Sequence, residues 1–269
     1  MSGASPRTFS SGSAPTVLRF RAKITAQVPG VAPKPASIDA ELVAARAFEE
    51  RRFRGPIGSM VAAEQQRVLA NMIGRIHERT ILDVGTGFGR TAIALALGAA
   101  DVTAIDSSEA LLNEARRRAA AQIVKVNFVP GDPHALQFKA RAFDAVVCVG
   151  VLQSARDWHQ CLAEACRVAD RLVIFDYPSA RSVALLHSAV RRLIGRDRYR
   201  VLGRPAVEQA LQRSQFRIRS VHRQYVLPMW FHRAIGSRRL TSRVEEVLKR
   251  LGVLRRWGTP VTVCAERGI

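Results

Sequence analysis

The sequence predicts an α/β protein built on one doubly wound sheet, with helices on both faces. An apolar run of strand type, Ile81 to Val84, leads through a glycine-rich turn into a helix-forming run, Thr91 to Gly98, and then into a second strand-like run, Val102 to Ile105. The chain has 269 residues, 48% of them hydrophobic, which is enough for one sizeable core. We therefore expect one main domain with flanking segments.

The turn after the first strand contains three glycines, Gly85, Gly87 and Gly89. Glycine lacks a Cβ atom, so it adopts positive φ easily and lets a ligand approach the main chain. Asp106 closes the second strand about 20 residues after the first glycine, where a carboxylate can accept hydrogen bonds from both hydroxyls of a ribose. The pattern predicts a site for a cofactor that contains a nucleoside.

The details of this loop disfavour two common cofactors. A dinucleotide fingerprint needs a small residue at the sixth position counted from Gly85, and this chain has Arg90 there. A phosphate-binding P-loop needs a Gly-Lys-Ser/Thr sequence, and the loop contains no lysine. NAD and ATP are therefore disfavoured.

A Gly-x-Gly-x-Gly loop led by Asp83 strongly resembles motif I of the class I S-adenosylmethionine-dependent methyltransferases. Three later segments resemble the same family in register: PGDPHALQF (130–138), FDAVVCVGVLQSARDW (143–158) and DRLVIFDY (170–177). The similarity covers about residues 61–180. It implies a Rossmann-like, seven-stranded sheet with strand order 3-2-1-4-5-7-6 and an antiparallel last strand.

The resemblance also implies the cofactor, S-adenosylmethionine, and the positions that would bind it. Asp83 and the loop backbone would face the aminoacyl end, and Asp106 would bind the ribose. Asp132 would bond the adenine amino group, His134 would line the adenine pocket, and Val149 would border the transferable methyl group. The complete set of expected cofactor-binding residues is Asp83, Gly85, Thr86, Gly87, Gly89, Asp106, Ser107, Asp132, Pro133, His134 and Val149.

The acceptor is less well defined by the sequence. The end of the fourth strand reads Val149 to Gln153 and lacks an Asn/Asp-Pro-Pro-Tyr/Phe segment, which disfavours methylation of exocyclic base amines. The chain more closely resembles the small-molecule branch that includes ubiquinone- and menaquinone-biosynthesis methyltransferases, although it has Ser154 where those commonly have a histidine. We expect O- or C-methylation of a small, apolar or lipid- or quinone-like acceptor. An RNA methyltransferase and a non-catalytic cofactor-binding scaffold remain the alternatives.

The sequence assigns no catalytic residue and no metal site. Asp176, Tyr177 and His232 are candidates for a general base, but a structural role is expected for each. The four cysteines lack the spacing of a zinc site and fit buried thiols in a reducing cytosol: Cys148, Cys161, Cys166 and Cys264.

Positive charge is concentrated at the two ends of the chain. The formal net charge is +20, yet residues 61–180 contain 13 basic and 13 acidic residues, whereas residues 181–269 contain 20 basic and 5 acidic ones. This asymmetry predicts an anionic partner for the C-terminal part, with peripheral contact to an anionic membrane favoured over nucleic acid. Only five basic residues are lysines, so compositional drift is the alternative explanation.

The first 38 residues contain no acid and five basic residues, which predicts a disordered basic tail, with a mitochondrial transit peptide as the alternative. Residues 39–269 would form the methyltransferase domain, divided into a cofactor-binding core (61–180) and a basic substrate part that completes the sheet (181–269). The sequence has no uninterrupted apolar window of 18 residues. A cytoplasmic protein, in possible peripheral contact with a membrane, is expected.

Helical structure is expected from about Ile38, with a break at Gly55-Pro56 and a second helix over 60–76. In the resembling family this region closes over the cofactor, so Phe48, Phe53 and Arg54 are candidates for a cover, although ordinary packing is the more economical role for both phenylalanines.

Beyond Tyr177 the sequence predicts five further elements. They are a basic amphipathic helix with Val183, Leu186, Val190 and Leu193 on one stripe, a helix over 205–213, a half-exposed strand over 216–222, a helix capped by Ser242 and Glu245, and a last strand over 261–265. The aromatic segment 224–235 fits a core strand leading into a loop, or the wall of an apolar acceptor pocket.

Overall fold

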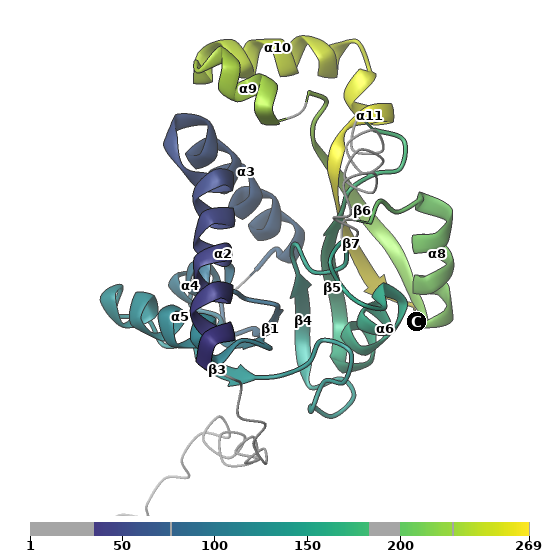
Figure 1. Ribbon diagram of the computed structural model, residues 1–269. Coiled ribbons are helices and arrows are strands. Elements are labelled where there is room, and N and C mark those ends of the chain that lie inside the picture. Colours follow the sequence, from purple (N-terminus) through teal and green to yellow (C-terminus); the bar gives the residue numbers. More distant parts are fainter. Residues whose placement is uncertain (1–34, 76, 183–199, 228, 269) are drawn as a thin grey trace, which may run out of the picture.

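The computed structural model describes residues 35–75, 77–182, 200–227 and 229–268. Its centre is a seven-stranded sheet with the order β3-β2-β1-β4-β5-β7-β6 (Figure 1). The first five strands run parallel to one another, and β7 pairs antiparallel with both β5 and β6. The strands are β1 (Thr80–Val84), β2 (Asp101–Asp106), β3 (Asn127–Pro130), β4 (Phe143–Cys148), β5 (Ala169–Tyr177), β6 (Phe216–Tyr225) and β7 (Thr259–Arg267).

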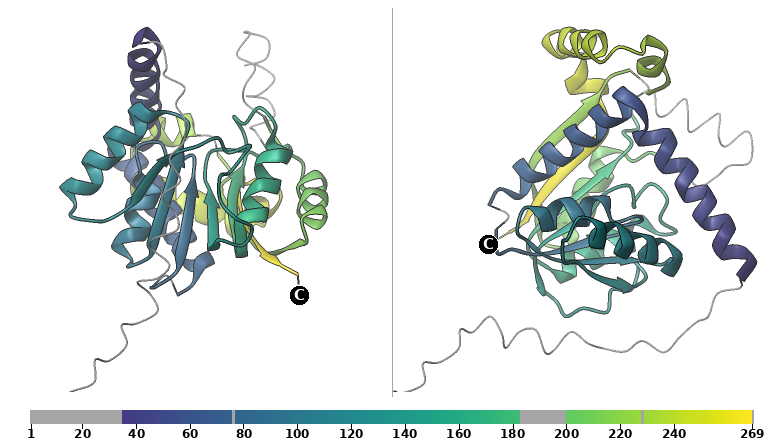
Figure 2. Two further views of the ribbon diagram at one scale, coloured as in Figure 1. Left: turned by 90° about the horizontal axis from the view of Figure 1, so that it is seen from below. Right: turned by 90° about the vertical axis from the view of Figure 1, so that its left-hand side faces the viewer.

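Helices cover both faces of this sheet, as Figures 1 and 2 show. One face carries a core made with α3, α4 and α5, and the other carries a core made with α6 and α8. The helices are α2 (Pro35–Phe53), α3 (Gly55–Ile73), α4 (Arg90–Leu97), α5 (Glu109–Ala121), α6 (Trp158–Val168), α8 (Arg204–Arg213), α9 (Met229–Ile235), α10 (Arg238–Arg250) and α11 (Val253–Trp257).

The parallel strands place their carboxyl ends at one edge of the sheet. β1 lies in the centre of this parallel part, between β2 and β4, with Val84 opposite Ile105 and Asp83 opposite Val147. The chain leaves β1 toward helices on one face and leaves β4 toward α6 on the other. This change of direction opens a crevice above the end of β1, the place where doubly wound sheets bind ligands.

The predicted fold class and strand order are confirmed. The predicted strand 80–84 has the bounds of β1, and the expected helices and strands after residue 200 occur as α8, β6, α10 and β7. All four cysteines are free and buried, as expected.

Three helices begin earlier than predicted. Helix α3 begins at Gly55, before the predicted start at residue 60, and residues 229–235 of the aromatic segment form helix α9 rather than a loop. Helix α2 begins at Pro35, so the predicted tail boundary at residue 38 falls inside a helix. A proline suits the first turn because the amide it lacks would have no partner there. Helix α10 begins at Arg238, where Ser237 Oγ accepts from the amide of Leu240, so Ser242 lies inside the helix rather than at its cap.

Two predicted features fall outside the described residues. They are most of the N-terminal tail, residues 1–34, and the basic amphipathic helix expected over 183–193 with its arginines at 191, 192 and 196.

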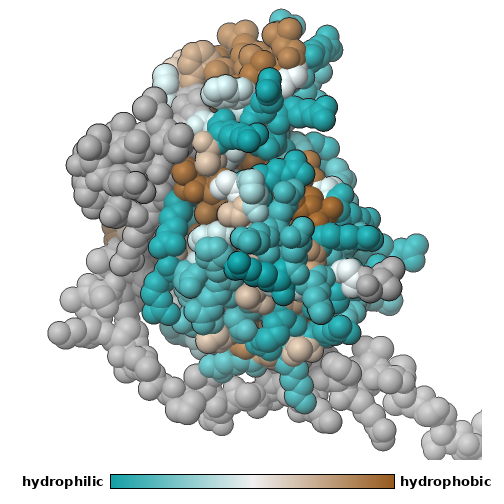
Figure 3. Space-filling model, turned by 90° about the vertical axis from the view of Figure 1, so that its right-hand side faces the viewer, coloured by the Kyte–Doolittle hydropathy of each residue, from teal (hydrophilic) through white to brown (hydrophobic). Residues whose placement is uncertain are grey.

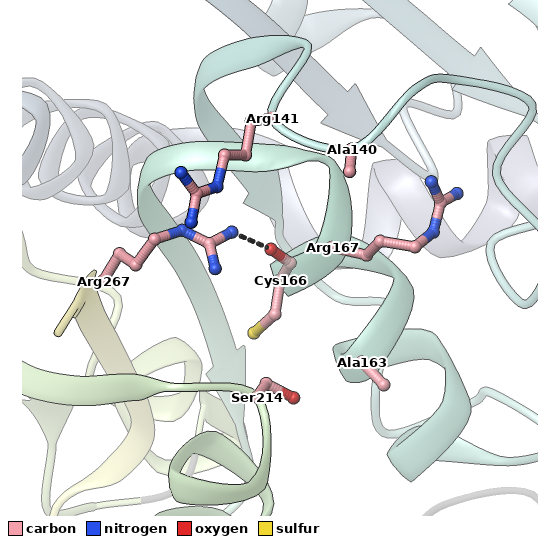
Figure 4. A pocket seen from close by; sticks show the side chains of 7 residues that line it. All are labelled: Ala140, Arg141, Ala163, Cys166, Arg167, Ser214 and Arg267. Atoms are coloured by element: carbon pink, nitrogen blue, oxygen red, sulfur yellow. Dashed lines mark hydrogen bonds between the residues drawn. The ribbon is translucent and has the colours of Figure 1, made fainter.

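A small hollow lies at the opposite edge of the sheet, where β4 and β5 begin (Figure 4). Three arginines surround it, Arg141, Arg167 and Arg267, but two of them are occupied by protein carbonyls. Arg267 donates to the carbonyls of Cys166 (2.8 Å), Ala169 (2.6 Å) and Asp170 (3.1 Å). Arg167 donates to two further carbonyls and to Glu164. The hollow is therefore a structural joint between the end of α6 and the start of β5.

Replacement of Arg267 by Met should destabilise the fold without affecting the far edge of the sheet. The substitution leaves three carbonyls, one in α6 and two at the start of β5, without their charged donor, which should cost about 1–3 kcal/mol. Thermal unfolding should then begin about 2–4 °C lower for each kcal/mol lost. Arg217→Met is the matched control, because Arg217 is exposed and its ion pair with Glu266 contributes little. Equal melting temperatures for the two variants would contradict this role.

Candidate functional site

A cavity opens above the carboxyl end of β1, between the sheet and helices α2 and α3. Its wall combines the glycine loop with residues from helices α2, α3, α4 and α5 and from the ends of β1 and β4. The lining residues are Ala45, Phe48, Glu49, Arg52, Phe53, Gln65, Asp83, Gly85, Thr86, Gly87, Phe88, Arg90, Thr91, Leu111, Val149 and Gly150. Five of the predicted cofactor residues are among them: Asp83, Gly85, Thr86, Gly87 and Val149.

The glycine loop has the backbone shape that its sequence predicts. Gly85, Gly87 and Gly89 have φ of 67°, 55° and 78°, in the left-handed region that side chains disfavour. A Cβ atom on Gly87 would meet no atom within 4 Å, so the main chain there faces open space. A Cβ on Gly89 would lie 2.9 Å from the Cβ of Ala115, so this glycine is needed for the close packing of α5. Gly87 thus opens the cavity, whereas the packing of the core requires Gly89 and also Gly85, whose Cβ would lie 2.6 Å from Val151 Cγ2.

Asp106 fixes this loop from the end of β2. Its Oδ2 accepts from the amide of Gly87 at 2.8 Å, and its Oδ1 accepts from the amide of Ser108 at 3.0 Å. The amide of Thr86 also donates to the carbonyl of Ile105 at 2.9 Å. The carboxylate is therefore held in one orientation beside the loop, while Ser107 next to it is exposed.

Asp83 is the buried acid of the cavity, with a relative exposure of 2%. Burial raises the pKa of its carboxyl group to about 7, although a hydrogen bond from Thr86 Oγ1 (2.7 Å) and the charge of Arg90 act in the opposite direction. A group with this pKa changes charge near neutral pH. Asp83 can therefore respond strongly to a cation placed beside it.

Arg90 is the first residue of α4, and its side chain lines the cavity. Its guanidinium stacks on the ring of Phe53, 4.1 Å from the ring centroid, and its Nη2 donates to Gln65 Oε1. Its Nη1 is buried and has no hydrogen-bond partner among the described residues. Burial, with the nearby charge of Arg52, lowers the pKa of Arg90. An unsatisfied buried donor of this kind indicates that an anionic group belongs beside it.

A second buried acid, Asp176, lies near the end of β5 and bonds to the loop that follows β4. Its Oδ1 accepts from the amide of Gly150 at 2.6 Å, and burial raises the pKa of its carboxyl group while Arg52 opposes this shift. The other two general-base candidates are also buried, Tyr177 with 2% exposure and His232 with none. The structure brings only Asp176 next to the cavity wall, through Gly150.

The predicted adenine residues lie after β3, beside the cavity rather than in its wall. Asp132 is exposed, and its Oδ1 is 2.7 Å from Nδ1 of His134 and accepts from the amide of the same residue. His134 is 9% exposed, and its Nε2 accepts from the amide of Asp157 at the start of α6. The accepting Nε2 implies that Nδ1 carries the proton and donates to Asp132. Pro133, between them, is half-buried.

Helix α2 supplies the cover. Phe48 and Phe53 line the cavity, whereas Arg54 has an 81% exposed side chain and does not. Sequence reasoning missed Glu49, Arg52 and Gln65, and it used Arg90 only to exclude NAD. A glutamine and an arginine on adjacent helices carry no local signal of a site. Only the packing of α2 and α3 over the loop brings them together.

The sequence itself matches one family model, described as "Methyltransferase domain", over residues 81–171. A demethylmenaquinone methyltransferase of Deinococcus radiodurans is 37% identical over 120 residues, covering 43% of this chain and 49% of the relative. A ubiquinone biosynthesis O-methyltransferase of Coxiella burnetii is 36% identical over 77 residues, covering 29% of this chain and 33% of the relative. The chain thus spans about half or less of these relatives.

The fold is also that of solved methyltransferases. The crystal structure of magnesium protoporphyrin IX methyltransferase from Synechocystis PCC 6803, with bound S-adenosylhomocysteine, superposes with a TM-score of 0.62 at 17% identity. The match covers 88% of this chain and all of that one. The family match therefore identifies a methyltransferase domain over residues 81–171, and the strand order and the superposition show that the sheet has the fold of solved methyltransferases.

Proposed function

We propose that this protein transfers a methyl group from S-adenosylmethionine to a small, apolar, quinone-like acceptor. The observation that carries the proposal is the glycine loop, pinned by Asp106 and flanked by the buried acid Asp83, at the carboxyl edge of a methyltransferase-type sheet. The names of two relatives, a demethylmenaquinone methyltransferase and a ubiquinone biosynthesis O-methyltransferase, support a quinone-like acceptor.

The residues present fit this cofactor. The main chain at Gly87 faces open space, so a bound group can approach it closely. Asp83 offers a carboxyl group for an ammonium, and Arg90 Nη1 offers a buried donor for a carboxylate. The two opposite charges of an amino acid end group would therefore meet complementary partners. Asp106 and Ser107 would bind the ribose, and Asp132, Pro133 and His134 would border the adenine.

When bound, S-adenosylmethionine would supply a methyl group on a positively charged sulfur. The acceptor atom would bond to the methyl carbon as the carbon–sulfur bond breaks, and the sulfur would leave as a neutral thioether. The protein's share of this in-line displacement is placement and exclusion of water. Val149 and Gly150 border the methyl side, and Phe48 and Phe53 cover the cavity from α2. A base must also take the acceptor's proton, and Asp176, which accepts from the amide of Gly150 in this wall, is the candidate.

The division of labour along the chain is part of the proposal. Residues 61–180 would hold the cofactor, and residues 181–269 would meet the acceptor and, for a lipid-like acceptor, an anionic membrane. The arginine-rich C-terminal part also keeps an RNA acceptor as the second candidate.

The acceptor class can be tested directly by supplying the protein and methyl-labelled cofactor to a cell extract. Label should enter the lipid fraction, because a quinone-like acceptor partitions there. A variant with Gly87→Val serves as the control, since a branched residue at a φ of 55° should distort the loop. Label in RNA would support the second candidate, and no incorporation by a protein that binds the cofactor would support a scaffold.

Asp106→Ala should weaken S-adenosylmethionine binding about tenfold or more, because it removes an acceptor of charge-assisted hydrogen bonds worth roughly 1.5–3 kcal/mol each. Isothermal titration measures the loss. Since Asp106 also holds Gly87, Asp106→Asn is the matched variant: it keeps one accepting oxygen and should recover part of the affinity. Unchanged affinity in Asp106→Ala would refute the ribose assignment.

Binding should strengthen with pH through Asp83. In the free protein the pKa of this carboxyl group is raised to about 7 by burial, so below that pH it must lose its proton before it can pair with an ammonium. Affinity should therefore rise from roughly pH 5.5 to 7 and then level off, before the ligand's own amino group deprotonates near pH 8.

Asp83→Asn should bind more weakly and show no such rise. Asp132→Asn is the control, and its cofactor affinity should still rise with pH. Hydrogen bonds from His134 lower the pKa of Asp132, so this carboxylate stays ionised across the range. A pH dependence that survives in Asp83→Asn would contradict the pairing.

A further inference from the structure

The chain between β6 and β7 is much longer than the fold requires. These strands are antiparallel neighbours, with Tyr225 opposite Thr259, and two residues can join such a pair. Here residues 226–258 lie between them and contain α9, α10 and α11, which we call the cap (229–257). Tyr177 at the end of β5 lies opposite Val261, so the cap leaves the sheet at the carboxyl edge, the edge of the cavity (Figure 1).

The cap packs on α3, one of the helices that cover the cavity. Ser242 Oγ of α10 lies 3.7 Å from Met60 Sδ of α3. Just before the cap, His222 Nε2 of β6 is 3.3 Å from Glu64 Oε1 of the same helix. The cap therefore contacts a helix that also forms part of the cavity wall.

Helix α10 buries polar residues and exposes apolar ones. Thr241 is fully buried and Glu245 is 9% exposed, whereas Leu240, Val247 and Leu251 are 50%, 55% and 70% exposed. With half-buried Val244, the apolar residues are spaced by four, three and four positions and form one stripe along the helix. A helix that packs on its own domain shows the opposite pattern.

The buried contacts of Glu245 explain this orientation. Its carboxylate accepts from the amides of Val226 and Leu227, at 3.0–3.2 Å, and its Oε1 lies 3.0 Å from Nε2 of fully buried His232. A buried carboxylate needs such partners, so it fixes which side of α10 faces the protein. The apolar stripe must then face outward.

The neighbouring helices add to this surface. Six of the eleven large hydrophobic side chains that are exposed in the described part of the chain lie in the cap. They are Trp230, Phe231, Leu240, Val247, Leu251 and Trp257. Figure 3 shows hydrophobic residues gathered at the top of the molecule, the end where α9 and α10 lie in Figure 1. A clustered apolar surface of this kind marks a contact site.

The same surface carries strong positive charge. The cap contains eight basic residues, all exposed, against two glutamates, a net formal charge of +6. The basic residues are Arg233, Arg238, Arg239, Arg243, Lys249, Arg250, Arg255 and Arg256. Glu245 is buried, and Glu246 is the one acid left beside them, near Lys249 and Arg250.

We propose that the cap docks the protein on an anionic lipid bilayer, with its tryptophans and aliphatic stripe in the headgroup region and its arginines on lipid phosphates. Exposed tryptophan, an apolar helix stripe and flanking basic residues are what an interfacial helix needs. None of the helices in the described ranges is long and apolar enough to cross a membrane.

The other partners fit this surface less well. A second copy would bring another charge of +6 against the first. RNA would leave Leu240, Val247 and Leu251 without apolar partners, because it is recognised by phosphate contacts and by stacking on aromatic rings. The docking deepens the proposed function, since it would bring the cavity to a lipid-like acceptor.

The test is sedimentation of the full chain with vesicles of phosphatidylcholine, alone or mixed in equal parts with phosphatidylglycerol. The chain should bind the anionic vesicles, and the binding should weaken as salt is raised. The combined variant Leu240→Ala, Val247→Ala and Leu251→Ala should lose about tenfold or more in affinity, because alanine keeps the helix but removes most of the inserted apolar area.

The matched control is Leu97→Ala with Ile123→Ala, two side chains that are 59% and 94% exposed outside the cap. It should bind vesicles as the unchanged chain does. In a second readout, brominated lipid should quench the emission of Trp230 and Trp257, and replacing both by Phe should remove the quenching, because the remaining Trp158 is buried.

Three results would overturn the proposal: vesicle binding that the triple variant retains in full, retention of the chain on RNA but not on anionic vesicles, or a dimer that the triple variant abolishes in a chain that binds no vesicles. Neither readout needs methyl transfer or cofactor. A chain that binds vesicles but not S-adenosylmethionine would therefore refute the proposed function alone, and the converse would refute the cap alone.

Discussion

The hydrogen bond from the amide of Gly87 to the carboxylate of Asp106 is the contact on which the site depends. It joins the loop after β1 to the end of β2 at Gly87, a residue with positive φ whose main chain faces the cavity. The same carboxylate accepts from Ser108 before the first turn of α5, so loop, strand and helix share one anchor. The glycine loop forms the base of the cavity, and residues of α2 and α3 form the opposite wall.

The part of the fold that the sequence predicted well is the part with local signals. The run from Ile81 to Asp106 combines strand, glycine turn and helix within one short segment, and each of these is visible without tertiary contacts. The strand order came from a family resemblance, because periodicity shows that strands exist but not which of them pair.

The residues that sequence reasoning missed are those whose role comes from packing. Arg90 was predicted to be too large for a dinucleotide loop. In the structure its side chain stacks on Phe53 and donates to Gln65, and both residues lie outside the four motif segments of the sequence. Likewise, the sequence predicted the helix that contains Val244 and Val247, but buried Glu245 turns its apolar face outward. A periodic pattern defines a stripe and does not say what covers it.

Helix α3 connects the two functional surfaces. Gln65 bonds Arg90 at the cavity. Glu64, next to it, contacts His222 of β6, and Met60, five residues before Gln65, contacts Ser242 of the cap. The cap is thus connected to the sheet through β6 and β7 and contacts a core helix. Residues 61–180 contain equal numbers of basic and acidic residues, whereas the cap is strongly basic. The positive charge of the cap therefore lies apart from the buried acid Asp83 and the buried Arg90 at the cavity. The uneven charge of the chain thus separates a strongly basic cap, which we propose binds an anionic bilayer, from a core in which basic and acidic residues balance.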